Sequence, residues 1–148
     1  MKSALIALLA FWVCWGVGCS KNLSEFQKTK AMAMLGDASA QGYLATMYYY
    51  GLGVEKDFKE AAKWQRKAAD QGYAKAQHKL GVMYNNGEGV LEDNVTAYAW
   101  WNIAAANGSK SAKDNKPKIA KDMTPEQIAK AQELSKEMVK KNPKLINK

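Results

Sequence analysis

Side chains that could carry out catalysis or bind a metal ion are few in this sequence. The 148 residues include one histidine, His78, and two cysteines, Cys14 and Cys19, both near the N-terminus. A Ser/His/Asp or Cys/His arrangement needs a partnered histidine, and no carboxylate lies close to His78 in the sequence. No cluster has the spacing of zinc ligands. Two carboxylates could still meet in space, but we predict no catalytic residue, no metal site, no cofactor and therefore no enzyme.

Two Gly-x-Gly pairs, Gly51-x-Gly53 and Gly87-x-Gly89, are the other residues whose spacing is known from chemistry. In nucleotide-binding proteins such glycines follow a strand and open a phosphate-binding loop, and neither condition is indicated here. Glycine also adopts the left-handed conformation that closes a helix C-terminus. These pairs are therefore predicted to end helices, so the elements around them decide the interpretation.

Residues 38–72 and 74–108 are two copies of one pattern, and each residue of the second copy lies 36 positions after its partner. A fixed period of about 20–50 residues is typical of stacked-repeat proteins. Apolar residues recur at helical spacing before each glycine pair, and alanines surround a tryptophan after it. The sequence predicts an all-α fold, a short α-solenoid of antiparallel helix pairs with about two full repeats plus flanking half repeats. The matched positions are Gly51 and Gly87, Gly53 and Gly89, Asp57 and Asp93, Trp64 and Trp100, and Gly72 and Gly108.

Each copy carries signals for the start of its second helix and for what that helix buries. Asp57 and Asp93 are suited to N-cap this helix, and Glu60 would complete a capping box with Asp57. Trp64 and Trp100 are predicted to fill the space beside small alanines. Replacing either with alanine should cost about 3–5 kcal/mol of folding free energy, the usual range for a large buried aromatic residue.

The segments flanking the two copies are expected to close the stack. Residues 22–36 are predicted to form a lone second helix of an earlier unit. After the second copy the pattern is lost, and Pro117 is expected to break or kink a helix because proline lacks an N–H. A Thr-Pro-Glu-Gln start signal predicts a capping helix over about 124–141. The tail, 144–148, is expected to fray.

The doubled pattern resembles the Sel1-like repeat, a relative of the tetratricopeptide repeat with a longer loop between its helices. The resemblance implies an adaptor or scaffold that binds proteins. Ala45 departs from the pattern, which has glycine at this position, as at Gly81. The resemblance is carried by Leu80-Gly81-x-x-Tyr84, Gly87-x-Gly89-Val90, Asp93, Ala97, Trp100, Ala104-Ala105 and Gly108, and by their partners in the first copy.

The concave face of such a stack is lined mainly by the first helix of each pair. Residues that differ between the copies are better binding candidates than residues that match, because packing alone explains the matches. The groove positions of the tetratricopeptide relative fall on Ser39, Gly42, Thr46, Tyr49, Tyr50, Lys75, His78, Val82, Asn85 and Asn86.

Tyr49 and Tyr50 are the most informative of these positions, because the second copy has asparagine at both places. Tyrosine combines a rigid apolar ring with a hydroxyl and is favoured at interfaces. Either ring could instead pack on Phe58 or Leu52 as part of the core. His78 could likewise be a packing residue, and Trp101 is expected to be buried by the closing helices.

The N-terminal residues are predicted to be an export signal. Lys2 precedes a continuous apolar stretch that is too short to span a bilayer as a stable helix. Residues 1–18 are therefore expected to be removed, which leaves 19–148 as one repeat domain. Val17-Gly18-Cys19 resembles a bacterial lipobox, so Cys19 is the predicted lipidation site; ordinary signal peptidase remains the alternative. The predicted location is the periplasm, with an anchor in the outer membrane.

The formal net charge of +8 at pH 7 leaves two interpretations of the surface open. The lysines either keep a small helical protein soluble or attract anionic lipid headgroups, wall polymers or an acidic protein. Export argues against nucleic acid as a partner. The expected function is non-catalytic protein binding in the bacterial cell envelope. Alternatives are an immunity protein that inhibits an antibacterial effector, such as a secreted lipase, and, with less support, a β-lactam-binding or hydrolysing enzyme.

Overall fold

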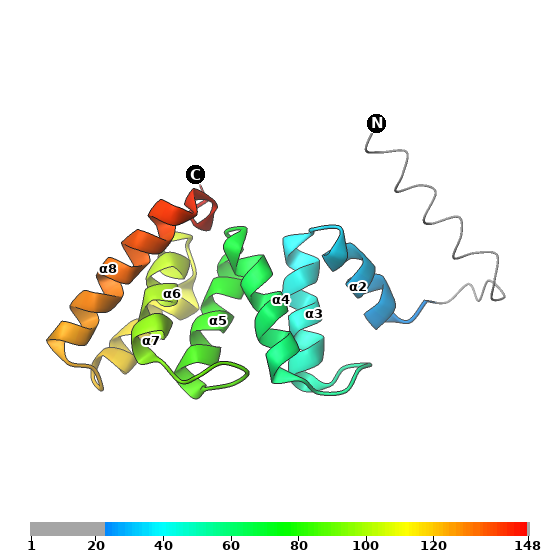
Figure 1. The fold of residues 1–148 in the computed structure, drawn as a ribbon, viewed down its shortest axis with the longest axis horizontal. Helices are drawn as coiled ribbons and strands as arrows, with labels where there is room; N and C mark the ends of the chain where they lie inside the picture. The colour runs from blue at the N-terminus through cyan, green and yellow to red at the C-terminus, as the bar shows by residue number, and fades with distance from the viewer. Residues whose placement is uncertain (1–22, 148) are drawn as a thin grey trace.

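The structure, a computed structural model, describes residues 23–147. Figure 1 shows the helices following one another along the long axis, from α2 at one end to α8 at the other. The described residues contain helices and no strand, so the all-α prediction is confirmed. The predicted export signal and Cys19 lie outside the described residues. The elements are α2 (Glu25–Met34), α3 (Ala38–Tyr50), α4 (Phe58–Asp70), α5 (Ala74–Asn86), α6 (Asn94–Ala106), α7 (Lys110–Ala120), α8 (Pro125–Lys141) and the short 3-10 helix η1 (Pro143–Leu145).

The two copies of the sequence pattern fold as two helix pairs, α3 with α4 and α5 with α6. Gly51 and Gly87 end the first helix of each pair in the left-handed conformation, with φ of 73° and 67°. Asp57 N-caps α4 as predicted, because its carboxylate accepts the backbone N–H groups of Lys59 and Glu60 at 2.9 and 3.0 Å. The predicted capping box is not completed, since the Glu60 carboxylate is paired with Lys63.

Helix α6 is the most fully covered helix of the stack, and its sequence has no charged face. It packs against α5, α7 and α8, whereas α4 keeps one face of charged side chains in solvent. A helix without a polar face is stable only when neighbours cover it all round. The residues of α6 that are buried are Ala97, Tyr98, Ala99, Trp100, Trp101, Ile103 and Ala104.

Pro117 was expected to break or kink a helix, and helix α7 shows that the predicted break is wrong. Pro117 lies inside α7, which continues to Ala120. Proline removes only one backbone donor, and its ring is exposed here, so the loss is small beside the contacts that α7 makes. Ala112 and Ile119 of α7 are buried in a cluster with Trp101 of α6. Burial of these apolar side chains therefore decides the conformation against local propensity.

The expectation of a frayed tail is also wrong. Leu145 is only 2% exposed and belongs to the cluster that contains Trp100 and Ile103. Its carbonyl accepts hydrogen bonds from the side-chain amides of Gln77, at 2.8 Å, and Asn107, at 2.6 Å. The chain end is thus fixed across the turns that follow α4 and α6. It lies beside the C-terminal end of α8 (Figure 1).

The two matched tryptophans have different surroundings. Trp100 is 1% exposed under Ile103 and the tail residue Leu145. Trp64 is partly exposed, and the ammonium of Lys67 lies 4.1 Å from its ring centroid. Lys67 occupies the position in the first copy that matches Ile103 in the second. Trp64 therefore has a solvated lysine beside it where Trp100 has a buried isoleucine. The burial predicted for both tryptophans is therefore confirmed for Trp100 and wrong for Trp64, so Trp64→Ala is expected to cost less.

Candidate functional site

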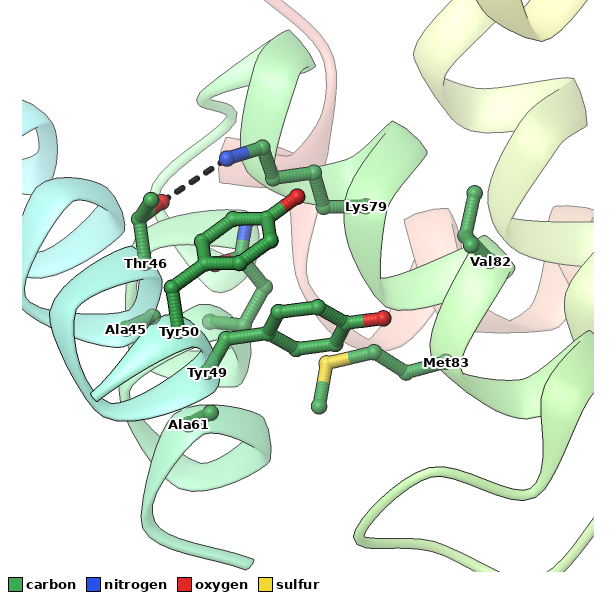
Figure 2. Close-up of a pocket in the computed structure, with 9 residues that line it drawn as sticks. Ala45, Thr46, Tyr49, Tyr50, Ala61, Lys79, Val82 and Met83 are labelled. Atoms are coloured by element: carbon green, nitrogen blue, oxygen red, sulfur yellow. Dashed lines mark hydrogen bonds between the residues drawn. The ribbon is translucent and has the colours of Figure 1, made fainter. Parts of the chain in front are cut away.

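The largest difference between the two copies lies in a pocket between the two helix pairs, hereafter the first pocket. Its volume is about 100 Å³, and it opens to solvent. In Figure 2 the rings of Tyr49 and Tyr50 extend from α3 towards the side chains of α5. Small side chains from α3 and α4 leave the space beneath these rings. The lining residues are Ala45, Thr46, Tyr49, Tyr50, Ala61, Gln65, Lys79, Val82 and Met83.

Tyr49 and Tyr50 have different roles in the first pocket. The ring of Tyr49 packs edge-on against Phe58 with centroids 5.0 Å apart, and its hydroxyl donates to Glu88 at 2.7 Å. This hydrogen bond, with some burial, raises the pKa of Tyr49 to about 12. The ring of Tyr50 packs edge-on against the ring of Tyr49 with centroids 4.8 Å apart, but Tyr50 remains 63% exposed. Tyr49 is thus a fixed wall, and Tyr50 is free to contact a ligand.

Lys79 places a cation at the mouth of the first pocket. Its ammonium donates to the Thr46 hydroxyl at 2.8 Å, drawn as the dashed line in Figure 2. Partial burial and the nearby charge of Lys75 lower the pKa of Lys79. Both causes disfavour the charged form of the Lys79 amine. An anion bound beside it would offset them, so Lys79 and the anion would stabilise each other.

A second pocket repeats the first one helix pair later. Each of its residues lies 36 positions after a residue of the first pocket, but the chemistry is different. Asn85 and Asn86 stand in place of the tyrosines, and Asn115 stands in place of Lys79. Trp101 occupies the floor where the first pocket has Gln65, which makes the second pocket shallow and polar. Its lining residues are Val82, Asn85, Asn86, Trp101, Asn115, Lys118 and Ile119.

The floor of the second pocket explains why the copies differ at Ala45 and Gly81. A Cβ atom at Gly81 would lie 2.6 Å from Cδ1 of Trp101 and closer still to Nε1. The indole is held there because its N–H donates to the His78 carbonyl at 3.0 Å. Trp101 is 3% exposed, so its predicted burial is confirmed. In the first copy Gln65 replaces the indole, and alanine is accommodated at position 45.

His78 joins α5 to α7 beside the second pocket. Its Nε2 lies 3.0 Å from the side-chain nitrogen of Asn115, and its ring stacks on Trp101 with centroids 6.3 Å apart. Burial, followed by the charge of Lys79, lowers the pKa of His78. Of the two interpretations left open for His78, these contacts favour the packing role.

A third pocket extends the first along α3 and α5 towards the N-terminal ends of these two helices. It shares Thr46, Gln65 and Lys79 with the first pocket, which in turn shares Val82 with the second. The three pockets therefore form one continuous surface, hereafter the groove. Nine of the ten positions carried over from the relative line it, and His78 contacts it through Asn115 and Trp101. The third pocket is lined by Ser39, Gly42, Tyr43, Thr46, Gln65, Tyr73, Lys75, Ala76 and Lys79.

Several groove residues were missed by sequence reasoning for two reasons. Lys79 and Gln65 face the pocket from positions that the carried-over list did not contain. Asn115 and Lys118 were missed because the repeat pattern is lost after the second copy. No groove position was therefore carried onto α7, which is the first helix of a third unit. The 36-residue offset would have found them, since they match Lys79 and Val82.

No three His, Cys, Asp or Glu side chains among residues 23–147 are close enough together to hold a metal ion. Within the same range, no helix combines the length and the apolar character needed to cross a membrane.

Comparison with known proteins places the chain in a family. The sequence model of the Sel1 repeat matches residues 29–73 and 74–109, which together make up more than half of the chain. The chain belongs to the Sel1 repeat family. Proteins of this family generally mediate protein–protein interactions and are typically non-catalytic. A search of curated proteins finds no match.

Two solved structures of Sel1 repeat proteins resemble this Sel1 chain. One is c5321, a protective antigen present in uropathogenic Escherichia coli strains that displays an SLR fold; it is 36% identical over 82% of this chain, with a TM-score of 0.73. The other is a Sel1 repeat protein from Oxalobacter formigenes, 38% identical over 61% of this chain, with a TM-score of 0.60. The matched region spans 28% of c5321 and 68% of the Oxalobacter protein.

Proposed function

We propose that this protein is a non-catalytic adaptor of the bacterial cell envelope and that it binds a protein partner in the groove. The observation that carries the proposal is the exposed ring of Tyr50 beside an open pocket of about 100 Å³. The second copy folds in the same way with asparagine at this position, so packing does not require the ring. Exposed tyrosines at the rim of a pocket are typical of residues that dominate binding energy at interfaces.

The envelope location in this proposal is supported by the sequence alone. A short positive segment and an apolar stretch precede Cys19. Metabolic labelling with a radioactive fatty acid, followed by membrane fractionation, tests it. Label and membrane association are expected for the natural chain and lost for Cys19→Ser. A soluble, unlabelled natural chain in the periplasm would instead favour ordinary signal cleavage.

An immunity protein is the second candidate function, in which the groove would block an antibacterial effector such as a secreted lipase. Its support is the divergence between the two pockets, because a surface repeated unit by unit would suit a repetitive ligand, whereas two unlike pockets suit one dedicated partner. An effector encoded next to this protein would favour it. Co-expression should then rescue cells that are exposed to the effector in the periplasm, and Tyr50→Ala should weaken the rescue.

The binding role itself is tested by quantitative capture from an envelope extract. Tyr50→Ala removes an exposed ring and should leave the fold intact, so captured partners should be lost without a change in melting temperature. Leu91→Ala is the matched control, because Leu91 is 90% exposed on the loop before α6 and does not line the groove. Retention of every partner by Tyr50→Ala at unchanged affinity would contradict the proposal.

A further inference from the structure

We infer that the groove accepts an extended acidic segment of the partner, with one apolar side chain in the first pocket and carboxylates beside the groove lysines. This inference rests on the proposed function and specifies the chemistry of the partner. It does not depend on where in the cell the partner is met.

The charges of the groove differ from those of the repeats as a whole. Between residues 23 and 108 acidic and basic residues are equal in number. Yet the described residues that line the three pockets include Lys75, Lys79 and Lys118 and no carboxylate. Two carboxylates lie just outside these linings: Glu88 accepts from the Tyr49 hydroxyl and, at 3.3 Å, from the Asn86 amide, and Glu25 accepts from the Tyr43 hydroxyl at 3.1 Å. The three lysines outnumber these two carboxylates, so the groove carries an excess of positive charge that favours an anionic partner.

Lys79 is the cation that would gain most from such a partner. It is the member of the three that lines both the first and the third pocket, and Thr46 holds its ammonium at the rim. Lys75 is its neighbour in the third pocket, where like charges repel. A carboxylate between them would relieve this repulsion and form charge-assisted hydrogen bonds.

The first pocket is suited to one apolar anchor. Its floor is made by Ala45, Ala61 and Gln65, all buried, and by Met83, whose flexible thioether adapts to different shapes. Tyr50 provides an exposed aromatic wall above this floor, as Figure 2 shows. A leucine or phenylalanine side chain would be enclosed on several sides there, and burial of its apolar surface would supply most of the affinity.

The second pocket is suited to peptide main chain. The indole of Trp101 forms its floor, and the pocket is more open to solvent than the first, so it encloses a large side chain less completely. Asn85, Asn86 and Asn115 line it instead, and a carboxamide both donates and accepts hydrogen bonds. These groups match the alternating N–H and C=O groups of an extended segment. The difference between the pockets would also fix the register, because the first pocket encloses an anchor more completely.

Fluorescence anisotropy with labelled synthetic decapeptides and the full mature chain tests the inference. The probe carries one central leucine flanked by aspartates, and its counterparts carry serines or lysines as flanks, or serine in place of leucine. The acidic leucine peptide is expected to bind saturably and about tenfold or more tighter than each counterpart. Its affinity should fall as salt rises from about 50 to about 500 mM, because added ions screen the lysines.

Charge-removing variants locate the site. Lys79→Gln and Lys118→Gln together should weaken binding of the acidic peptide about tenfold and flatten its salt dependence. Lys59→Gln and Lys63→Gln together are the matched control, because both lysines are exposed on α4 and line none of the groove pockets. Tyr50→Ala should weaken every leucine peptide and keep the preference for acidic flanks.

Three results would overturn the inference. They are equal affinity for acidic, neutral and basic peptides, an equal loss with the α4 control, and no saturable binding of any probe below about 1 mM. If partner capture still depends on Tyr50 in any of these cases, the adaptor function stands and only the acidic partner is rejected. If partner capture is independent of Tyr50 while the acidic peptide binds as described, the groove binds acidic segments. In that case the adaptor proposal is rejected.

Discussion

Gly81→Ala tests whether the contact between α5 and Trp101 governs both stability and the shape of the second pocket. A Cβ atom at position 81 would lie 2.6 Å from Trp101 Cδ1, a distance that real Cβ atoms essentially never show. The indole cannot move away freely, since it is 3% exposed and its N–H donates to the His78 carbonyl. The variant must therefore shift the helix or break this hydrogen bond.

The expected magnitude follows from two opposing effects. Overpacking of a core costs about 1–3 kcal/mol. Alanine is favoured over glycine inside a helix by about 0.5–1 kcal/mol, which offsets part of that cost. Gly81→Ala should therefore destabilise the natural chain by about 1–2 kcal/mol. In a Trp101→Gln background the indole is absent, as in the first copy, and Gly81→Ala should stabilise by about 0.5–1 kcal/mol. The resulting coupling energy, about 1.5–3 kcal/mol, is typical of residues in direct contact.

Urea denaturation followed by far-ultraviolet circular dichroism measures this cycle without relying on tryptophan fluorescence. The four proteins are the natural chain, the two single variants and the double variant. Ala45→Gly in the first copy is the control, and it should lower stability equally in the natural chain and in the Trp101→Gln background. Additive effects of Gly81→Ala and Trp101→Gln, within about 0.5 kcal/mol, would refute the reasoning.

Three further predictions concern the two matched tryptophans, the C-terminal tail and His78. Trp100→Ala should cost about 3–5 kcal/mol in urea denaturation and Trp64→Ala roughly half as much, because Trp64 is partly exposed; equal costs would contradict the burial difference. Leu145→Ala should cost about 2–4 kcal/mol and increase amide exchange in α6, whereas an unchanged urea midpoint would mean that the tail does not seal the core. Since burial lowers the pKa of His78 from 6.5, the folded state binds fewer protons than the unfolded state. Stability should then fall as pH drops below about 6.5, and His78→Gln should flatten this slope in denaturation series between about pH 5 and pH 8.

The two helix pairs could be predicted because their signals are local. Glycines at positive φ, aspartate N-caps and helical apolar spacing act within a few residues, and each appears twice in register. The burial of α6 on all sides could also have been predicted from its sequence. Its sequence, Asn94–Ala106, contains no charged residue, and such a helix must be covered on every side.

Helix α7 and the tail could not be predicted, because distant contacts decide them. Local propensity at Pro117 favours a break, but Ile119 gains more by burial against α6. The tail has one apolar anchor, Leu145, and its carbonyl is bound by amides from far earlier in the chain. No short window of sequence contains both partners of such contacts.

The same limit explains what was found and missed in the groove. Tyr49, Tyr50, Asn85 and Asn86 were found because their positions follow from the repeat register. Their unequal roles were not, since the hydrogen bond from Tyr49 to Glu88 spans the two copies. Lys118 was missed together with α7, although it lines the second pocket.

The two copies act as a natural control for each other, and this strengthens the link between packing and binding. Both fold with the same helix pair, yet one combines Ala45 with Gln65 and has a more enclosed pocket, whereas the other combines Gly81 with Trp101 and has a more open pocket lined by asparagines. The side chain at this position of the second helix thus distinguishes the two units. The double variant Gly81→Ala/Trp101→Gln should then do more than recover part of the stability lost in Trp101→Gln. It should give the second unit the floor of the first, so that a leucine peptide gains a second register in the groove.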